Sequence, residues 1–224
     1  MFEELQKLWE SDTIKPSFNY VHVVLALYIF GEHPEGIGRY RLKSDLLIGS
    51  GTARSLINRL SETIDFIKVH EQNKRKGHVL TQKGQNFLHK TKERIILLDE
   101  GDLAALKDLI IDYENIYSFL SMVKEASGKI KSGIEQRDAA IKVDGLGATC
   151  LIYDGESFQF PSKSNLMTID EKIEIKNEIQ SYLKKIINNL PDMNLEEKDV
   201  IVIGLGDSFE KARLASINAA LSLI

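Results

Sequence analysis

The sequence predicts an α+β protein with two domains, and three observations lead to this prediction. The chain has 224 residues, which is enough for two cores of ordinary size. Between Gly36 and Gly84, two short helical segments joined by a glycine turn are followed by a hairpin pattern. From Tyr117 onward, strand-like and helix-like segments alternate. We therefore expect a first domain at residues 1–98 and a mixed α/β domain at residues 99–224.

The segment from Thr52 to Glu62 predicts a helix with one apolar and one polar face. Its apolar residues recur at the helical spacing i, i+3, i+4 and i+7, at Ala53, Leu56, Ile57 and Leu60. The polar residues of the other face are Thr52, Arg54, Ser55, Asn58 and Arg59. Arginine and asparagine side chains can form paired hydrogen bonds with base edges in the major groove of DNA. The pattern is therefore typical of a recognition helix.

A glycine turn separates this helix from an apolar helical segment before it. We expect Gly49 to adopt the left-handed conformation that ends the first helix, and Ser50 to cap the second. Two helices joined by such a short turn form a helix-turn-helix. Arg39 and Arg41 lie in the first of them, and we expect both to contribute to the same DNA-binding surface.

The residues after the helix pair predict a β-hairpin with a cationic tip. Residues 64–70 have the composition of a strand, and residues 78–81 would return antiparallel to it. The turn between them contains Lys74, Arg75 and Lys76. Three adjacent cations can neutralise DNA phosphates. A helix-turn-helix followed by such a hairpin is a winged helix-turn-helix, with residues 73–77 as the tip of the wing.

The distribution of charge supports a DNA-binding role for the first domain. The whole chain has a net charge of −4. Residues 39–94 contain 13 Lys and Arg against 5 Asp and Glu, a net charge of +8, whereas residues 95–224 contain 14 against 22, a net charge of −8. Because a partner responds to the local field, the cationic segment fits a nucleic acid although the chain as a whole is acidic.

The remaining segments complete the expected element order. Helices are expected at residues 2–10, 16–31, 84–98, 103–113, 129–143 and 168–189, and from Asp207 to the end of the chain, where Asp207 and Glu210 have capping-box spacing. Strands are expected at residues 117–123, 148–153, 157–160 and 199–205, with a hairpin turn at Asp154-Gly155. The continuous apolar run 199–205 predicts a buried central strand.

Several motifs give the chain a resemblance to known families. The Leu80-Thr81-Gln82-Lys83-Gly84 step after the hairpin resembles the winged-helix domains of bacterial and archaeal transcription regulators. The strings Gly38-Arg39, Thr52-Ala53-Arg54-Ser55-Leu56, Gly133-Ile134-Glu135-Gln136-Arg137-Asp138 and Gly147-Ala148-Thr149 resemble an archaeal two-domain family whose C-terminal half is functionally uncharacterised. The resemblance covers most of the chain, and only its N-terminal part implies a function, the regulation of transcription.

Glu135, Arg137 and Asp138 form the densest polar cluster outside the hairpin. On a helix, Ile134, Arg137 and Asp138 share a side, so part of this cluster can turn inward. The family resemblance makes the cluster a candidate for lining a ligand or subunit site. The residues alone favour the alternative, a solvated helix face with intrahelical ion pairs.

Other motifs do not predict a reaction centre. Gly204-Leu205-Gly206 lacks the third glycine of a dinucleotide-binding fingerprint, because Phe209 stands in its place. Ser127-Gly128-Lys129 lacks the first glycine and the final Ser or Thr of a phosphate-binding loop. No spacing selects a pair of carboxylates, a nucleophile with its base, or a set of metal ligands. We therefore expect no enzyme activity, no cofactor and no metal.

The cellular location follows from what the sequence contains. A single cysteine, Cys150, cannot form an intramolecular disulfide and fits a reducing compartment. No basic and apolar leader is evident at the N-terminus, and no apolar run has membrane-spanning length. We expect a cytoplasmic protein without a membrane partner.

The sequence therefore predicts a DNA-binding transcriptional regulator that binds double-stranded DNA as a homodimer. The predicted DNA-binding residues are Arg39, Arg41, Ser50, Thr52, Arg54, Ser55, Asn58, Arg59, Lys74, Arg75 and Lys76. The C-terminal domain would sense a small-molecule effector, form the dimer, or do both. Two alternatives remain: a winged helix that serves as a protein-interaction adaptor, and an enzyme with a pocket near Glu135 to Asp138.

Overall fold

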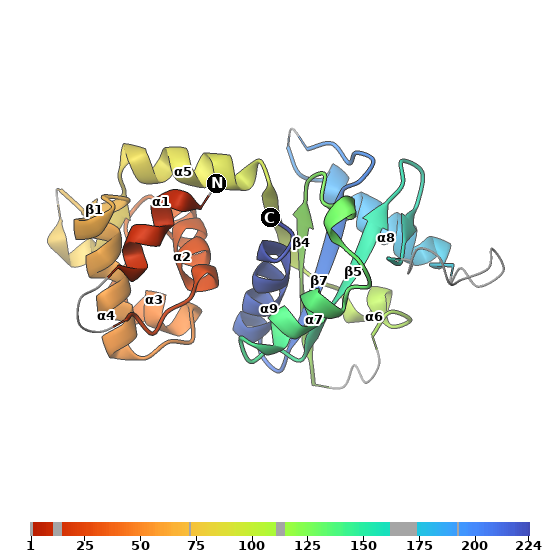
Figure 1. The fold of residues 1–224 in the computed structure, drawn as a ribbon, viewed down its shortest axis with the longest axis horizontal. Coiled ribbons are helices and arrows are strands. Elements are labelled where there is room, and N and C mark those ends of the chain that lie inside the picture. Colours follow the sequence, from red (N-terminus) through yellow and green to blue (C-terminus); the bar gives the residue numbers. More distant parts are fainter. Residues whose placement is uncertain (1, 11–14, 72, 111–114, 162–173, 192) are drawn as a thin grey trace. The chain divides into compact units, whose positions relative to one another are not determined.

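The computed structural model describes residues 2–10, 15–71, 73–110, 115–161, 174–191 and 193–224 (Figure 1). The chain forms two units, Met1–Lys92 and Glu93–Ile224. Helices and strands occur in both, so the predicted α+β class is confirmed. The predicted boundary after residue 98 is wrong, because residues 95–98 belong to a strand in the sheet of the second unit.

The first unit consists of helices and one short strand pair. Its elements are α1 (Glu3–Gln6), α2 (Tyr20–Glu32), α3 (Arg39–Asp45), α4 (Ser50–Asn58), β1 (Ile67–Val69), β2 (His78–Leu80) and α5 (Gln82–Lys92) (Figure 1). A π-helical turn at Arg59–Thr63 extends α4. Strands β1 and β2 pair antiparallel, and Ile37, just before α3, forms a bridge with His78 on the other side of β2.

Helix α2 is the core helix of the first unit. Its residues from Val23 to Phe30 are all buried, as expected for a helix covered on several sides. The helix begins at Tyr20, later than predicted, because Asn19 and His22 form a capping box in which the Asn19 N–H donates to His22 Nδ1 at 3.0 Å.

The second unit is built on one five-stranded antiparallel sheet. Its elements are β3 (Ile95–Glu100), α6 (Leu103–Leu106), β4 (Tyr117–Val123), α7 (Ile134–Ile141), β5 (Gly147–Tyr153), β6 (Phe158–Gln159), α8 (Asn177–Asn188), β7 (Val200–Gly206) and α9 (Phe209–Leu221). The strand order is β3-β4-β7-β5-β6. The strands predicted at residues 117–123, 148–153 and 199–205 are confirmed, and β7 is central as predicted.

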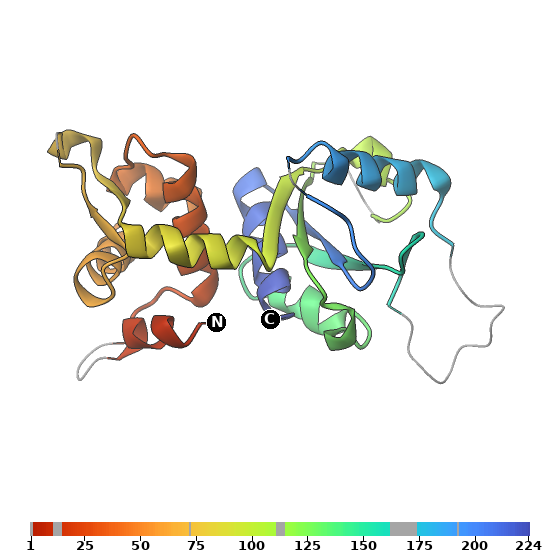
Figure 2. The same ribbon diagram turned by 90° about the horizontal axis from the view of Figure 1, so that it is seen from above.

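Helices cover both faces of this sheet (Figures 1 and 2). Ile201 and Ile203 of β7 pack in the cluster that contains α8, whereas Val200 and Val202 pack in the cluster that contains α9. Because neighbouring residues of β7 enter different cores, the strand is apolar at almost every position instead of alternating.

The same arrangement explains the error at residues 95–98, which were predicted to be the end of a helix. Ile95 packs on the α9 side of the sheet and Ile96 on the α8 side. A four-residue apolar run is therefore an edge strand with both faces covered, and the helix predicted from Gly84 ends at Lys92.

Three helix starts in the second unit differ from the predictions. Helix α7 begins at Ile134, because Ser127–Lys129 forms a separate 3-10 turn. Helix α8 begins at Asn177, and the predicted helical residues 168–173 lie outside the described residues. Helix α9 is capped by Ser208, whose Oγ accepts the Lys211 N–H at 3.3 Å, while Asp207 instead pairs with Lys211 Nζ at 2.8 Å.

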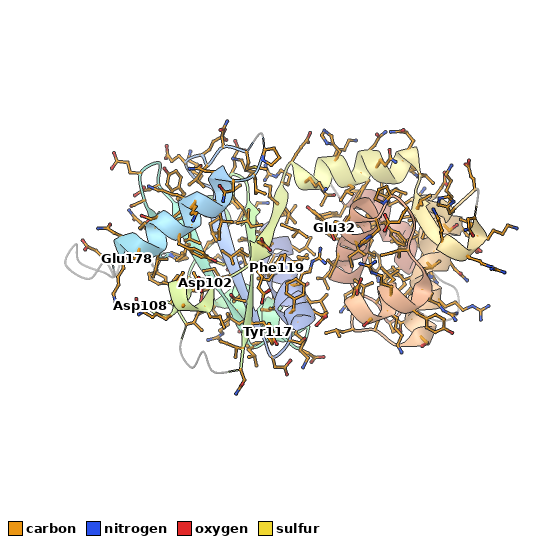
Figure 3. All side chains as sticks on the ribbon, turned by 180° about the vertical axis from the view of Figure 1, so that it is seen from behind. Glu32, Asp102, Asp108, Tyr117, Phe119 and Glu178 are labelled. Atoms are coloured by element: carbon orange, nitrogen blue, oxygen red, sulfur yellow. The ribbon has the colours of Figure 1, made fainter. Side chains whose placement is uncertain are left out.

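The short helix α6 lies against α8. Asp102 caps α6 as predicted, its Oδ1 accepting the Ala104 N–H at 2.9 Å, although the helix ends at Leu106 and residues 111–113 lie outside the described residues. Lys176 Nζ, at the start of α8, lies 3.0 Å from Asp108 Oδ2, after the end of α6. Figure 3 shows Asp102 and Asp108 near Glu178 of α8. Among the described residues, no helix combines the length and apolar character needed to cross a membrane.

Candidate nucleic-acid interface

Helix α4 is amphipathic in the way the sequence predicts. Ala53, Leu56 and Ile57 are buried, and Leu60 continues this face into the π-helical turn. The opposite face carries Ser50, Arg54 and Asn58, which are exposed, and Ser55, which is half-buried. The helix thus combines an anchored underside with a polar, cationic outer face.

The turn before α4 differs in detail from the prediction. Gly49 has φ −66° and ψ 155°, so it is the extended N-cap residue of α4 and Ser50 is the first helical residue. The left-handed residue is Leu47, with φ 53°. Leu47 N–H donates to Ser44 O at 3.1 Å and Ile48 N–H to Lys43 O at 3.2 Å, which is the Schellman pattern that ends a helix.

Two of the predicted DNA contacts, Arg59 and Thr52, instead join their helix to segments that precede α2. Arg59 turns toward the N-terminal segment, where its Nη1 donates to Leu8 O at 2.8 Å and to Glu10 O at 3.1 Å. The predicted outward position of Arg59 is therefore wrong. Thr52 is half-buried, and its Oγ1 lies 2.7 Å from Ser17 Oγ. Thr52 thus joins α4 to the segment before α2.

Helix α3 presents a second cationic surface. Arg41 is exposed, with Nη2 at 2.8 Å from His33 Nε2 and Nε at 3.7 Å from Asp45 Oδ2. The Arg39 guanidinium lies 5.2 Å from the ring centroid of Tyr40. Tyr40 itself is 74% exposed, which is unusual for an aromatic side chain. Tyr40 is not among the predicted interface residues, because an aromatic residue within a helical segment is ordinarily assigned to the core.

The hairpin tip, residues 73–77, is cationic and exposed as predicted. Lys74, Arg75 and Lys76 form a 3-10 turn, in which Asn73 Oδ1 accepts the Arg75 N–H at 3.0 Å. All three cationic side chains are exposed, and no ion pair within the described part of the chain holds any of them. Their positive charge is therefore available to a partner.

The base of the hairpin is fixed to the segment before α3. Ile37 and His78 exchange backbone hydrogen bonds of 2.9 Å in both directions. Gly77 has φ 88°, and a Cβ atom there would lie 2.1 Å from Ile37 O. Glycine is thus required by both conformation and space, and the close approach holds the tip in a defined position relative to α3.

The predicted cluster of Glu135, Arg137 and Asp138 lies on the solvent-facing side of α7. Arg137 pairs with Asp138 at 2.9 Å, and Glu135 lies 3.8 Å from Lys131. The inward-facing residues are Gln136, Ala139 and Ala140. The prediction that Ile134, Arg137 and Asp138 turn inward is therefore wrong, and the arrangement matches the alternative of a solvated face with ion pairs.

Cavities lie elsewhere. In the first unit, a cavity of about 420 Å³ has an apolar floor of Phe30, Leu80 and Leu88 and a rim that includes His89 and Lys92. In the second unit, an open groove of about 490 Å³ is lined by Asp99, Glu100, Gly101, Asp102, Tyr182 and Ile186. Glu135, Arg137 and Asp138 line neither of them.

Comparisons with known proteins support part of the predicted resemblance. The family described as "Domain of unknown function (DUF4443)" matches residues 115–223, within the second unit. Among solved structures, the hypothetical protein PH0730 from Pyrococcus horikoshii OT3 is similar to this chain, with 25% identity and a TM-score of 0.61 over 92% of this chain and 93% of that chain. The search of curated proteins found no match. The chain thus resembles an archaeal protein over both units.

Proposed function

We propose that this chain is a DNA-binding transcriptional regulator whose first unit is a winged helix-turn-helix. The order of elements supports this proposal. The helix-turn-helix is formed by α3 and α4, and the β1–β2 hairpin follows as the wing, with the bridge at Ile37 as a third strand position. The single observation that carries the proposal is the exposed cationic surface on these elements.

Helix α4 and the hairpin tip lie at the same end of the first unit (Figures 1 and 2). Arg54 and Asn58 are exposed on α4, and Lys74, Arg75 and Lys76 are exposed on the tip. A helix with free guanidinium and amide groups suits the major groove, and adjacent free cations suit the phosphate backbone. Charge supports the same partner, because residues 1–92 contain 14 Lys and Arg against 10 Asp and Glu, a net of +4.

The proposal assigns two roles to these residues. Arg54 and Asn58 contact base edges, with Ser50 and Ser55 beside them on α4. Lys74, Arg75 and Lys76 contact phosphates, together with Arg39 and Arg41 on α3. Arg59 and Thr52 support the interface from inside the unit, because their hydrogen-bond partners belong to the N-terminal segment and the segment before α2.

The experiment is a selection of bound fragments from random double-stranded DNA, followed by affinity measurements on the selected sequence and on scrambled controls. Arg54→Ala and Asn58→Ala should each reduce discrimination between these sequences by about 1–3 kcal/mol. The triple change of Lys74, Arg75 and Lys76 to alanine should weaken binding to all sequences alike.

Lys90→Ala is the matched control for charge, because Lys90 is exposed on α5 and outside the proposed interface. It should leave discrimination unchanged. If Arg54→Ala and Asn58→Ala, like the triple variant, lose affinity equally for every sequence, the assignment of α4 as the recognition helix is wrong. If the wild-type chain selects no sequence and does not bind duplex DNA at low salt, the proposed function itself fails.

We further propose that the second unit forms the dimer of the regulator. Binding of a small-molecule effector is assigned to the same unit. Two copies of one winged helix can contact two half-sites of a symmetric operator, which a single copy cannot.

A further inference from the structure

Within the part of the chain that the structure describes, strand β5 is unpaired along most of its outer edge. On one side it pairs with β7 without interruption from Gly147 to Ile152. On the other side it pairs with β6 only at Ile152 and Tyr153. Within the described residues, nothing pairs with the outer edge of β5 between Gly147 and Leu151.

The ladder geometry tells which backbone groups lie on this edge. In an antiparallel strand, successive residues direct their N–H and C=O groups to opposite sides. Tyr153 N–H donates to Asp199 O at 2.9 Å, toward β7, so alternation directs the N–H and C=O of Ala148 and Cys150 outward. Unpaired strand groups of this kind are a template for another strand.

The other edges of the sheet are protected. On the outer side of β6, the Gln180 side chain imitates a neighbouring strand: its Oε1 accepts the Phe158 N–H at 2.7 Å and its Nε2 donates to Phe158 O at 2.8 Å. Strand β3 has a bulge between Leu97 and Glu100 and ends in two carboxylates, Asp99 and Glu100. Both devices discourage edge pairing, whereas residues 147–151 of β5 contain no charge, proline or bulge in the ladder.

The surface next to β5 fits association with an identical chain. Helix α7, which packs on β5, and the loop after it expose Ile134, Ile141 and Leu146. Residues 131–146 contain three cations and three anions, a net charge of zero, although the second unit contains 15 Lys and Arg against 23 Asp and Glu. A neutral, partly apolar surface on a unit of charge −8 avoids the repulsion that two copies would otherwise meet.

We infer that a second copy of this chain pairs its own β5 antiparallel to this edge, so that two sheets join across a two-fold axis. The axis passes beside Thr149, which then lies opposite Thr149 of the second copy. Ala148 and Cys150 lie opposite Cys150 and Ala148 of that copy and exchange backbone hydrogen bonds. The edge is self-complementary, as an isologous interface requires. The inference specifies the dimer surface of the proposed regulator but does not depend on DNA binding.

Charge complementation at Thr149 tests this geometry on the full chain. Two identical charges directly opposite each other across strands repel, so Thr149→Glu and Thr149→Lys should each weaken the dimer at least about tenfold. An equimolar mixture of the two variants should recover a heterodimer, because the opposite charges then face each other. Thr149→Val is the neutral control and should remain dimeric. Sedimentation velocity without DNA gives all four oligomeric states.

Recovery on mixing excludes misfolding as the cause of dissociation. The inference is overturned if the wild-type chain is a monomer at all concentrations, or if both charged variants stay dimeric. It is also overturned if they dissociate with intact circular dichroism spectra and the mixture remains monomeric.

An engineered disulfide gives a second, independent test. Residues opposite each other in a non-hydrogen-bonded pair have Cα atoms about 4.5 Å apart, within the range that a disulfide spans. Thr149→Cys should therefore form a covalent dimer under mild oxidation. The wild-type chain should not, because Cys150 is buried and burial raises the pKa of its thiol to about 12. Glu156→Cys, exposed in the β5–β6 turn, is the control and should crosslink much more slowly.

Measuring DNA binding by the same variants separates this inference from the proposed function. Dissociated Thr149 variants that still bind a half-site show that the winged helix works without the dimer. A dimer that complements correctly but does not bind DNA supports the β5 interface and contradicts the regulator proposal.

Discussion

At the scale of single residues, Arg59 belongs to the polar side of its helical segment, yet its side chain turns toward the N-terminal segment of the first unit. Its guanidinium holds two carbonyl groups of the N-terminal segment, Leu8 O and Glu10 O. Arg59→Ala should destabilise the first unit by about 1–2 kcal/mol, because two hydrogen bonds from a charged donor to half-exposed carbonyls are lost. Urea unfolding followed by the fluorescence of Trp9, the single tryptophan, measures this.

Arg54→Ala is the matched comparison for Arg59, because Arg54 is exposed on the same helix and should leave stability within about 0.5 kcal/mol of the wild type. If Arg59→Ala keeps full stability but loses base discrimination, Arg59 belongs to the recognition surface after all.

His22 makes the stability of the first unit depend on pH. Burial lowers its pKa from the ordinary value of 6.5, so the unfolded chain binds a proton more readily than the folded chain. The stability that the neutral ring provides is fully present above this ordinary value and is lost as pH falls below it toward the lowered folded pKa. Unfolding free energy from Trp9 fluorescence should therefore decrease as the pH falls below 6.5.

His22→Gln is the informative variant for this pH effect. A glutamine can accept the Asn19 N–H in the capping box but does not titrate. The variant should keep its stability near neutral pH and show a smaller loss in acid. Part of the loss should remain, because burial also lowers the pKa of His78. An unchanged pH dependence in His22→Gln would show that His22 does not contribute.

At this scale, the sequence predicted which side chains of α4 are buried, because helical spacing alone determines the apolar stripe. It did not predict the left-handed Leu47 or the inward Arg59. Both depend on contacts that spacing cannot reveal: a Schellman hydrogen-bond pattern in one case, and carbonyl groups some fifty residues away in sequence in the other.

At the scale of elements, Gly204 and Gly206 allow α9 to lie directly on β7. A Cβ atom at Gly204 would lie 2.2 Å from Ser216 N, and one at Gly206 would lie 2.4 Å from Ala212 N. These backbone atoms of α9 cannot move aside without displacing the helix. The Gly-Leu-Gly motif is thus explained by helix-to-strand packing and needs no bound phosphate.

Gly204→Ala should therefore destabilise the second unit by about 1–3 kcal/mol or more, as overpacking does. Gly128→Ala is the control, because a Cβ atom there has no neighbour within 4 Å. Thermal unfolding followed by circular dichroism compares the two variants. Equal midpoints for Gly204→Ala and Gly128→Ala would contradict the close packing of α9 on β7.

Elements with a strong local pattern were predictable, and elements defined by their neighbours were less so. The run 199–205 was correctly predicted as a central strand, because it is long and follows a turn-rich segment. The run 95–98 was predicted as a helix end, because an apolar run of four residues has no period that separates a helix from a strand covered on both faces.

At the scale of the whole molecule, two units with opposite charge carry the proposed division of labour. The first unit has a net charge of +4 and the second −8, which sum to the −4 of the chain. The two-part organisation was predictable from length and charge. The strand order β3-β4-β7-β5-β6 was not, because pairing between distant strands leaves no local pattern. The unpaired edge of β5 among the described residues follows only from that order.

The salt dependence of DNA binding tests the central claim most directly, because it counts the phosphates that the cationic surface contacts. Each contact should add about 0.9 to the slope of log affinity against log salt concentration. The triple alanine variant of Lys74, Arg75 and Lys76 should therefore bind duplex DNA with a slope shallower by about 2.7 than that of the wild type. A wild-type chain that does not bind at low salt, or a variant with an unchanged slope, would contradict the account.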